Sequence, residues 1–245
     1  MTGRITAAIA ARVLGQLRHD HRTIGLMLVV PCALITLLWW VYTDNSRLFD
    51  TIGPQLLGVF GLVVMFLVTS ITTLSERTSG TLERLFTLPM GKLDFLLGYA
   101  LAFGAVALVQ GFLAAGLSVW VLGLDVQGGV GPLVLVAALS GVLGTALGLL
   151  VSAFAATEFQ AVQFMPAFVL PQLLVCGLLV PRDELPTVLE WVSYATPLSY
   201  AVDATTEVTQ HATWTTALTW DVVALIAFTV GGLLLGSATL RRRTP

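Results

Sequence analysis

Long apolar segments with almost no charge constrain this chain more than any other feature. Six of them occur, at about 24–43, 52–74, 95–123, 130–156, 159–180 and 217–239. A helix rises about 1.5 Å per residue, so about twenty residues cross the roughly 30 Å hydrocarbon core of a bilayer. The sequence therefore predicts an all-α polytopic membrane protein with six transmembrane helices in one domain, residues 24–240.

The composition agrees with this prediction. Of the 245 residues, 56% are hydrophobic and 11% are charged, whereas about a quarter of the residues in soluble proteins are charged. The first apolar segment lacks a small-residue cleavage pattern and is expected to be an anchor rather than a cleaved signal peptide. Cys32 and Cys176 lie inside apolar segments, where packing roles are more typical than a disulfide or a metal site.

Residues 1–23 are predicted to form a cytoplasmic amphipathic helix in the plane of the lipid headgroups. At about 100° per residue its larger apolar side chains share one face and its arginines lie on or near the other. The apolar set is Ile5, Ile9, Val13, Leu14 and Leu17, and the basic set is Arg4, Arg12, Arg18 and Arg22.

The orientation follows from the basic residues. With the N-terminus inside, ten of the twelve Lys and Arg residues fall on the inner side, and only Arg47 and Arg182 fall in outer loops. Cytoplasmic loops carry such an excess of positive charge. Both termini, including the basic tail 241–245, and the loop around residues 75–89 are therefore predicted to be cytoplasmic.

That inner loop joins the second and third spans and is the most distinctive polar stretch. It carries Glu76, Arg77, Glu83 and Arg84, and charges of this kind are expelled from a bilayer core. Apolar residues between positions 82 and 88 share a helical face, and Pro89 prevents continuation. The pattern predicts a short amphipathic helix on the membrane surface, with an ordinary connecting loop as the alternative.

The longest outer loop, from Pro181 to about residue 216, is acidic and aromatic. Thr187 and Glu190 match a capping box, and Trp191 and Tyr194 follow, so a short amphipathic helix is expected there. Aromatic residues of this kind prefer the membrane interface, which favours a re-entrant loop over a solvated hairpin.

The fourth and fifth spans show two further patterns. In the fourth, Ser140, Gly144, Gly148 and Ser152 recur every four residues, which favours close helix packing within the bundle, with a dimer interface as the second possibility. In the fifth, Pro166 and Pro171 stand among three glutamines, and Thr157 with Gln160 forms a capping box at its start. A kinked, partly polar span suits the wall of a pathway, although a packing kink is equally compatible.

No catalytic constellation is visible. The chain has no phosphate-binding loop, no His-x-x-x-His pair and no paired carboxylates at membrane depth, so neither nucleotide hydrolysis nor a metal site is expected. Asp221 is the only Asp, Glu, Lys, Arg or His within the spans. Ion-coupled transporters usually hold an ionisable group or a broken helix at mid-membrane, so any transport is expected to draw its energy from a partner subunit.

Two blocks of sequence stand out. The first runs from Glu76 through Gly80, Pro89, Lys92 and Asp94 to Gly98. The second runs from Pro166 through Gly177, Pro181, Arg182, Pro186, Tyr194, Pro197 and Asp203 to Ala204. In order and spacing both blocks resemble the ABC-2 type permeases, the membrane subunits of bacterial drug, lipid and polysaccharide exporters, which are related in fold to the ABCG half-transporters. Two departures, Cys176 where serine is frequent and Thr-Thr-Glu207 where an arginine is common, weaken assignment to a subfamily.

The resemblance implies a pair of permeases, identical or homologous, above two ATP-binding subunits that carry ATP and Mg²⁺, so that this chain has no cofactor and is not itself an enzyme. It also nominates three sets of residues. The set coupled to the ATPase is Glu76, Arg77, Gly80, Thr81, Leu82, Glu83, Arg84 and Leu85. The set lining the substrate path is Gln55, Phe60, Met165, Phe168 and Gln172. The set marking the re-entrant outer loop is Pro181, Pro186, Trp191, Pro197 and Tyr200.

The sequence thus favours the permease subunit of an exporter of small lipophilic or amphipathic compounds, in the cytoplasmic membrane of a bacterium and with no nucleic-acid partner. Two alternatives stay open. One is a stand-alone secondary transporter, against which the lack of mid-membrane charge counts. The other is a non-transporting membrane partner of an ATPase.

Overall fold

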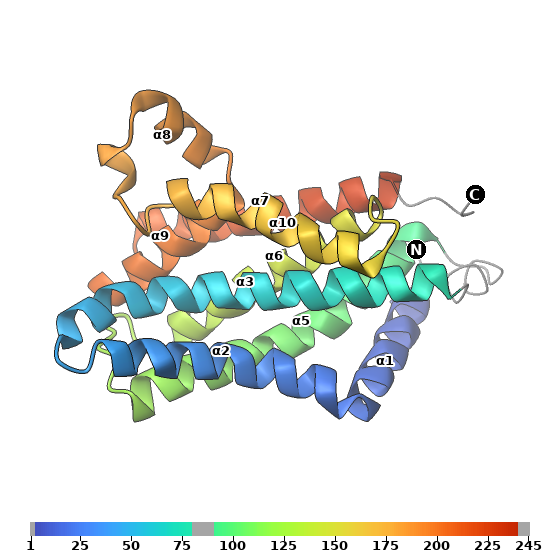
Figure 1. The fold of residues 1–245 in the computed structure, drawn as a ribbon, viewed down its shortest axis with the longest axis horizontal. Coiled ribbons are helices and arrows are strands. Elements are labelled where there is room, and N and C mark those ends of the chain that lie inside the picture. The colour runs from blue at the N-terminus through green and yellow to red at the C-terminus, as the bar shows by residue number, and fades with distance from the viewer. Residues whose placement is uncertain (1–2, 80–90, 240–245) are drawn as a thin grey trace.

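The computed structural model describes residues 3–79 and 91–239, and every regular element in this part is helical (Figure 1). One end of the bundle carries α8, and the other carries α1; we call these the α8 end and the α1 end. In chain order the elements are α1 (Gly3–His19), α2 (His21–Val41), α3 (Ser46–Thr78), α5 (Lys92–Gly116), η1 (Leu117–Val121), α6 (Val130–Ser152), α7 (Glu158–Val175), η2 (Arg182–Glu184), α8 (Thr187–Tyr194), α9 (Pro197–Gln210) and α10 (Thr216–Thr239).

Five helices of the described part are long and apolar enough to cross a membrane: α2, α3, α5 with η1, α6 and α10. Each overlaps a predicted span. Large apolar side chains face outward on them, for example Val29, Trp40 and Leu101, which are 62%, 72% and 57% exposed. The predicted fifth span is occupied by α7, which is not among these five helices. It has only 18 residues, and these include two prolines and three glutamines. A total of six spans therefore stays a prediction.

The centre of the bundle is the pair α3 and α6, whose backbones touch. A Cβ atom at Gly144 would lie 2.2 Å from the Leu62 carbonyl oxygen, and one at Gly148 would lie 2.6 Å from that of Phe66. Only glycine permits such an approach. On α10, Gly232 and Gly236 likewise lie against α6. The interpretation of the small residues as packing surfaces within the bundle is therefore confirmed.

The helix α1 matches the predicted amphipathic element and packs against α5. Gly98 makes this contact possible, since a Cβ atom there would lie 2.6 Å from the Ile9 side chain. The buried face differs from the predicted one: Thr6 and Ala10 join it, Ile5 is only partly buried, and Leu14 is 38% exposed. Arg12, predicted on or near the polar face, turns toward α3. Asp20 then interrupts the helix and caps α2, accepting a hydrogen bond from the Thr23 amide at 3.1 Å.

The segment between α7 and α10 contains more structure than the sequence predicted. The short helix at 187–194 is confirmed as α8, which projects from the bundle in Figure 1. The capping box assigned to Thr187 is wrong, because Pro186 is the cap and Thr187 already lies inside the helix, where its side chain cannot receive the capping bond. The cap by Thr157 on α7 is confirmed, but Gln160 accepts from the Ala156 amide at 2.8 Å. The 14-residue α9, packed against α3 and α10, was not predicted.

Candidate functional site

The predicted coupling residues divide at the end of α3. Glu76 and Arg77 lie in its last turn, whereas Gly80, Thr81, Leu82, Glu83, Arg84 and Leu85 lie outside the described residues. The predicted amphipathic helix of that loop is outside them as well.

Glu76 is buried, with 9% of its surface exposed, and forms an ion pair inside the bundle. The Arg12 Nη2 atom lies 3.1 Å from both carboxylate oxygens and 3.0 Å from the Tyr99 hydroxyl, which itself donates to Glu76. Burial lowers the pKa of Arg12, but the bonds and charges of Glu76 and Tyr99 outweigh this and raise it above its ordinary value. A carboxylate is tolerated in a buried position only when it is paired and hydrogen-bonded in this way. Because Arg12 lies on α1 and Tyr99 on α5, Glu76 links α3 to both of these helices.

Two further polar contacts lie at the α1 end. Arg77 donates to the carbonyl of Ser152, the last residue of α6. Asp94 accepts from the Gly91 amide at 3.1 Å and from the Thr6 hydroxyl at 3.4 Å, so it caps α5 and binds α1. Glu76, Arg77 and Asp94, three charged side chains close to the predicted coupling segment, are therefore fixed by neighbouring helices.

A cavity of about 470 Å³ opens beside this cluster. Its walls come from the end of α1, the start of α2, the end of α3 and the first residue of α7, and they include Asp20, Ser75, Glu76 and Glu158.

The residues predicted to line the substrate path gather where α3 meets α7 and α9. Phe60 and Met165 are partly buried in one apolar cluster, and the rings of Phe66 and Phe168 stack with centroids 6.2 Å apart. The two glutamines have structural contacts. Gln55 donates to the Thr206 hydroxyl at 3.1 Å, and Gln172 accepts from the Leu198 amide at 3.3 Å, which fixes the start of α9 to α7.

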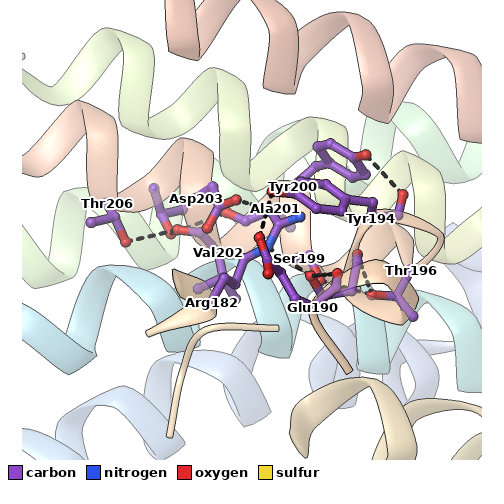
Figure 2. Close-up of polar contacts among 12 residues, drawn as sticks. Arg182, Glu190, Tyr194, Thr196, Ser199, Tyr200, Ala201, Val202, Asp203 and Thr206 are labelled. Atoms are coloured by element: carbon purple, nitrogen blue, oxygen red, sulfur yellow. Dashed lines mark hydrogen bonds and ion pairs between the residues drawn. The ribbon is translucent and has the colours of Figure 1, made fainter. Parts of the chain in front are cut away.

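Arg182 is the centre of the segment that carries α8 (Figure 2). Its Nε donates to Ser193 at 3.0 Å, its Nη1 forms an ion pair with Asp203, and its guanidinium lies 4.5 Å from the Tyr194 ring centroid. Burial raises the pKa of Asp203, and Arg182 offsets part of this rise. Both residues lie in the second block that resembles the family, but neither was among the site residues nominated from the sequence. A lone arginine in a strongly acidic loop was a further signal.

The five residues predicted to mark this loop have distinct places. Pro181 and Pro186 immediately precede η2 and α8, and Pro197 is the first residue of α9. Proline suits these positions because its fixed φ angle and missing N–H cost nothing at the start of a helix. Trp191 is 72% exposed on α8, while the Tyr200 hydroxyl donates to the Tyr194 carbonyl at 2.8 Å.

Two adjoining cavities lie beneath this segment. The larger, about 670 Å³, is bounded by the start of α3, the chain from Gly177 to Asp183, α8 and α9. The smaller, about 240 Å³, lies between the start of α3, the end of α9 and the loop that joins η1 to α6, which contributes Asp125 and Gln127. Because α3 also lines the cavity at the α1 end, one continuous helix borders cavities at both of its ends.

Comparison with known proteins identifies relatives of this chain. The probable multidrug ABC transporter permease YbhR of Escherichia coli is 24% identical over 167 residues, or 68% of this chain and 45% of that protein. ABC transporter G family member 20 of Dictyostelium discoideum is 24% identical over 160 residues, or 65% of this chain and 22% of that protein. The chain thus spans less than half the length of these relatives. The model of the family described as ABC-2 type transporter matches residues 5–209, and the chain belongs to that family.

Proposed function

We propose that this chain is the membrane-spanning permease subunit of an ATP-binding cassette exporter. It moves amphipathic or hydrophobic compounds out across the cytoplasmic membrane of a bacterium, with both termini on the cytoplasmic side. Two separate subunits hydrolyse ATP with Mg²⁺, and a second permease, identical or homologous, completes the path. Membership of the family supports this proposal, as does the name of the Escherichia coli relative, a probable multidrug permease.

The observation that carries the proposal is the continuity of α3. Its 33 residues run from the cavity lined by Thr51 and Gln55 to the cavity lined by Ser75 and Glu76. At about 1.5 Å per residue this is a rod of about 50 Å. The predicted coupling segment follows directly, so a push by an ATPase on that segment is delivered to α3 and, through Glu76, to α1 and α5.

The internal contacts of Glu76 and Arg77 give these two residues a particular part in the proposal. They attach the last turn of α3, which leads into the coupling segment, to α1, α5 and α6. Residues 81–85 then make the contact with the ATPase, with Leu85 on the apolar side of the predicted helix and Glu83 on the polar side.

The first experiment is purification of the protein from its own host in mild detergent, followed by mass spectrometry and an ATPase assay. We expect a stoichiometric ATPase with a phosphate-binding loop, stimulated by a lipophilic compound and supporting ATP-dependent transport in vesicles. A lone protein without a nucleotide-hydrolysing partner would contradict the proposal and favour a stand-alone transporter. An ATPase complex that transports nothing would favour the non-transporting partner.

Variants test the coupling assignment separately. Glu83→Ala and Leu85→Asp should uncouple ATP hydrolysis from transport while expression and thermal stability stay normal. Glu184→Ala is the matched control, because Glu184 is an exposed carboxylate at the α8 end. Normal efflux in both coupling variants would contradict the assignment of residues 81–85 to the contact with the ATPase.

A further inference from the structure

The larger cavity at the α8 end has the size and lining of a site for an amphipathic molecule. Its volume of about 670 Å³ lies within the range of small-molecule pockets, about 300–1,000 Å³. One part of the lining is apolar, with Ile52, Leu178, Leu179 and Val202, and the ring of Tyr194 adds an aromatic surface. The smaller cavity shares Thr51, Thr206 and Gln210 with it, so the two cavities adjoin one another.

The charges around this space have one predominant sign. Asp183, Glu190 and Asp203 line the larger cavity, and Asp50 and Asp125 line the smaller one. Arg182 is the only Lys or Arg among the described lining residues, and it is already paired with Asp203. None of the other four carboxylates forms an ion pair with a described residue.

This arrangement discriminates between ligands by charge. A cleft whose walls are of low dielectric and carry one sign of charge concentrates the opposite ion and repels the same ion. An anion placed here would face four unneutralised carboxylates, whereas a cation would be attracted to them while its apolar body contacts Leu178, Leu179 and Val202.

We propose that the adjoining cavities beneath α8 and α9 bind amphipathic organic cations, which names a substrate class for the exporter. Only the role of this site in transport rests on the proposed function. The binding itself is a property of this chain.

The test uses two probes that share one apolar body. Tetramethylrhodamine ethyl ester is a lipophilic cation, and tetramethylrhodamine with a free carboxylate is its zwitterionic counterpart. The full-length permease is placed in nanodiscs of zwitterionic lipid, and binding is followed by fluorescence polarisation with empty nanodiscs subtracted. No ATPase or ATP is present, so failure of coupling cannot affect the result.

Two double variants, each of which removes two negative charges, are compared. The lining variant is Asp183→Asn with Glu190→Gln, which leaves the Arg182–Asp203 pair intact and keeps an amide oxygen to accept from the Tyr194 hydroxyl. The control is Asp44→Asn with Glu184→Gln, because both carboxylates are exposed at the same end of the bundle and line none of the three cavities described above. Thermal unfolding midpoints establish that both proteins fold.

We expect the cation to bind the wild type about tenfold more tightly than the zwitterion, because a single full charge near two or more carboxylates is worth about a factor of ten or more at intermediate dielectric. The lining variant should lose most of this preference and the control should keep it. The preference should also fall as salt is raised. Equal binding of both probes, binding of neither, or an unchanged preference in the lining variant would overturn the proposal. A permease that binds the cation but never transports it with an ATPase would contradict the proposed function alone.

Discussion

The Arg12 guanidinium in α1 lies 3.1 Å from the Glu76 carboxylate in α3, although 64 residues separate them in the chain. The Tyr99 hydroxyl of α5 completes the cluster. The N-terminal amphipathic helix is thus held by an internal ion pair as well as by its apolar face.

Loss of the Arg12 side chain should destabilise the protein more than its partial exposure suggests. Arg12→Gln leaves the Glu76 carboxylate buried without its cation, and we expect a cost of about 1–3 kcal/mol. The measurement is the thermal unfolding midpoint in detergent. Arg18→Gln, which removes an exposed arginine of the same helix, should have little effect. In a double-mutant cycle with Glu76→Gln, purely additive costs would show that the pair is not coupled.

The contact of α3 with α6 predicts opposite effects for two glycine substitutions. Gly144→Ala places a methyl group 2.2 Å from the Leu62 carbonyl oxygen, so the helices must separate, at about 1–3 kcal/mol. Gly231→Ala meets nothing within 4 Å and should be neutral or stabilise by up to about 1 kcal/mol. Unfolding midpoints compare the two variants, and equal midpoints would contradict the packing described for α3 and α6.

Arg182 should hold α8 in place through its planar guanidinium as well as its charge. Arg182→Lys keeps a cation near Asp203 but loses the bond to Ser193 and the stacking on Tyr194. We expect amide exchange in residues 187–194 to become about tenfold faster, which corresponds to a loss of about 1.4 kcal/mol. Exchange in α10 and in an Arg47→Lys control should not change. Unaltered protection of α8 would show that its own packing suffices.

The burial of Asp203 gives its contribution to stability a definite sign with pH. Its pKa is raised in the folded protein by burial, and by Glu207 to a lesser extent, against the attraction of Arg182. A carboxyl with a raised folded-state pKa contributes stability fully below its unfolded pKa and loses it as the pH rises through the folded value. The unfolding midpoint of the wild type minus that of Asp203→Asn should therefore increase on acidification. An increase with rising pH would mean that the ion pair dominates over burial.

The length and uniform apolar character of the spans were enough to predict most of the bundle. The segments at 24–43 and 130–156 and those like them are long and uniform, so their helices needed no tertiary information. The helix α9 was missed because its sequence is mixed: Ser199, Asp203 and Glu207 suggest a solvated loop, and only the contact of Ala201 and Ala204 with neighbouring helices makes it a buried element. Burial of short mixed segments depends on partners that a local pattern does not reveal.

The same limit applies to the candidate site. A helical wheel places Arg12 on or near the polar face of α1, and nothing within residues 4–18 indicates that a carboxylate 64 positions later lies beside it. Glu76 was singled out as part of an unusually charged stretch, but its internal partners could not be read from the sequence. For Gln55 and Gln172 the sequence indicated polar groups among apolar residues, whereas the structure shows what each bonds, Thr206 and Leu198.

The glycine contacts between α3 and α6 also limit how the protein can move. Helices whose backbones touch at Gly144 and Gly148 cannot slide past one another without collision of carbonyl oxygens. The pair must therefore travel as one rigid body in any working cycle. In the proposed transport cycle, rearrangement is therefore expected among the elements packed around that body, such as α7 and the segment carrying α8.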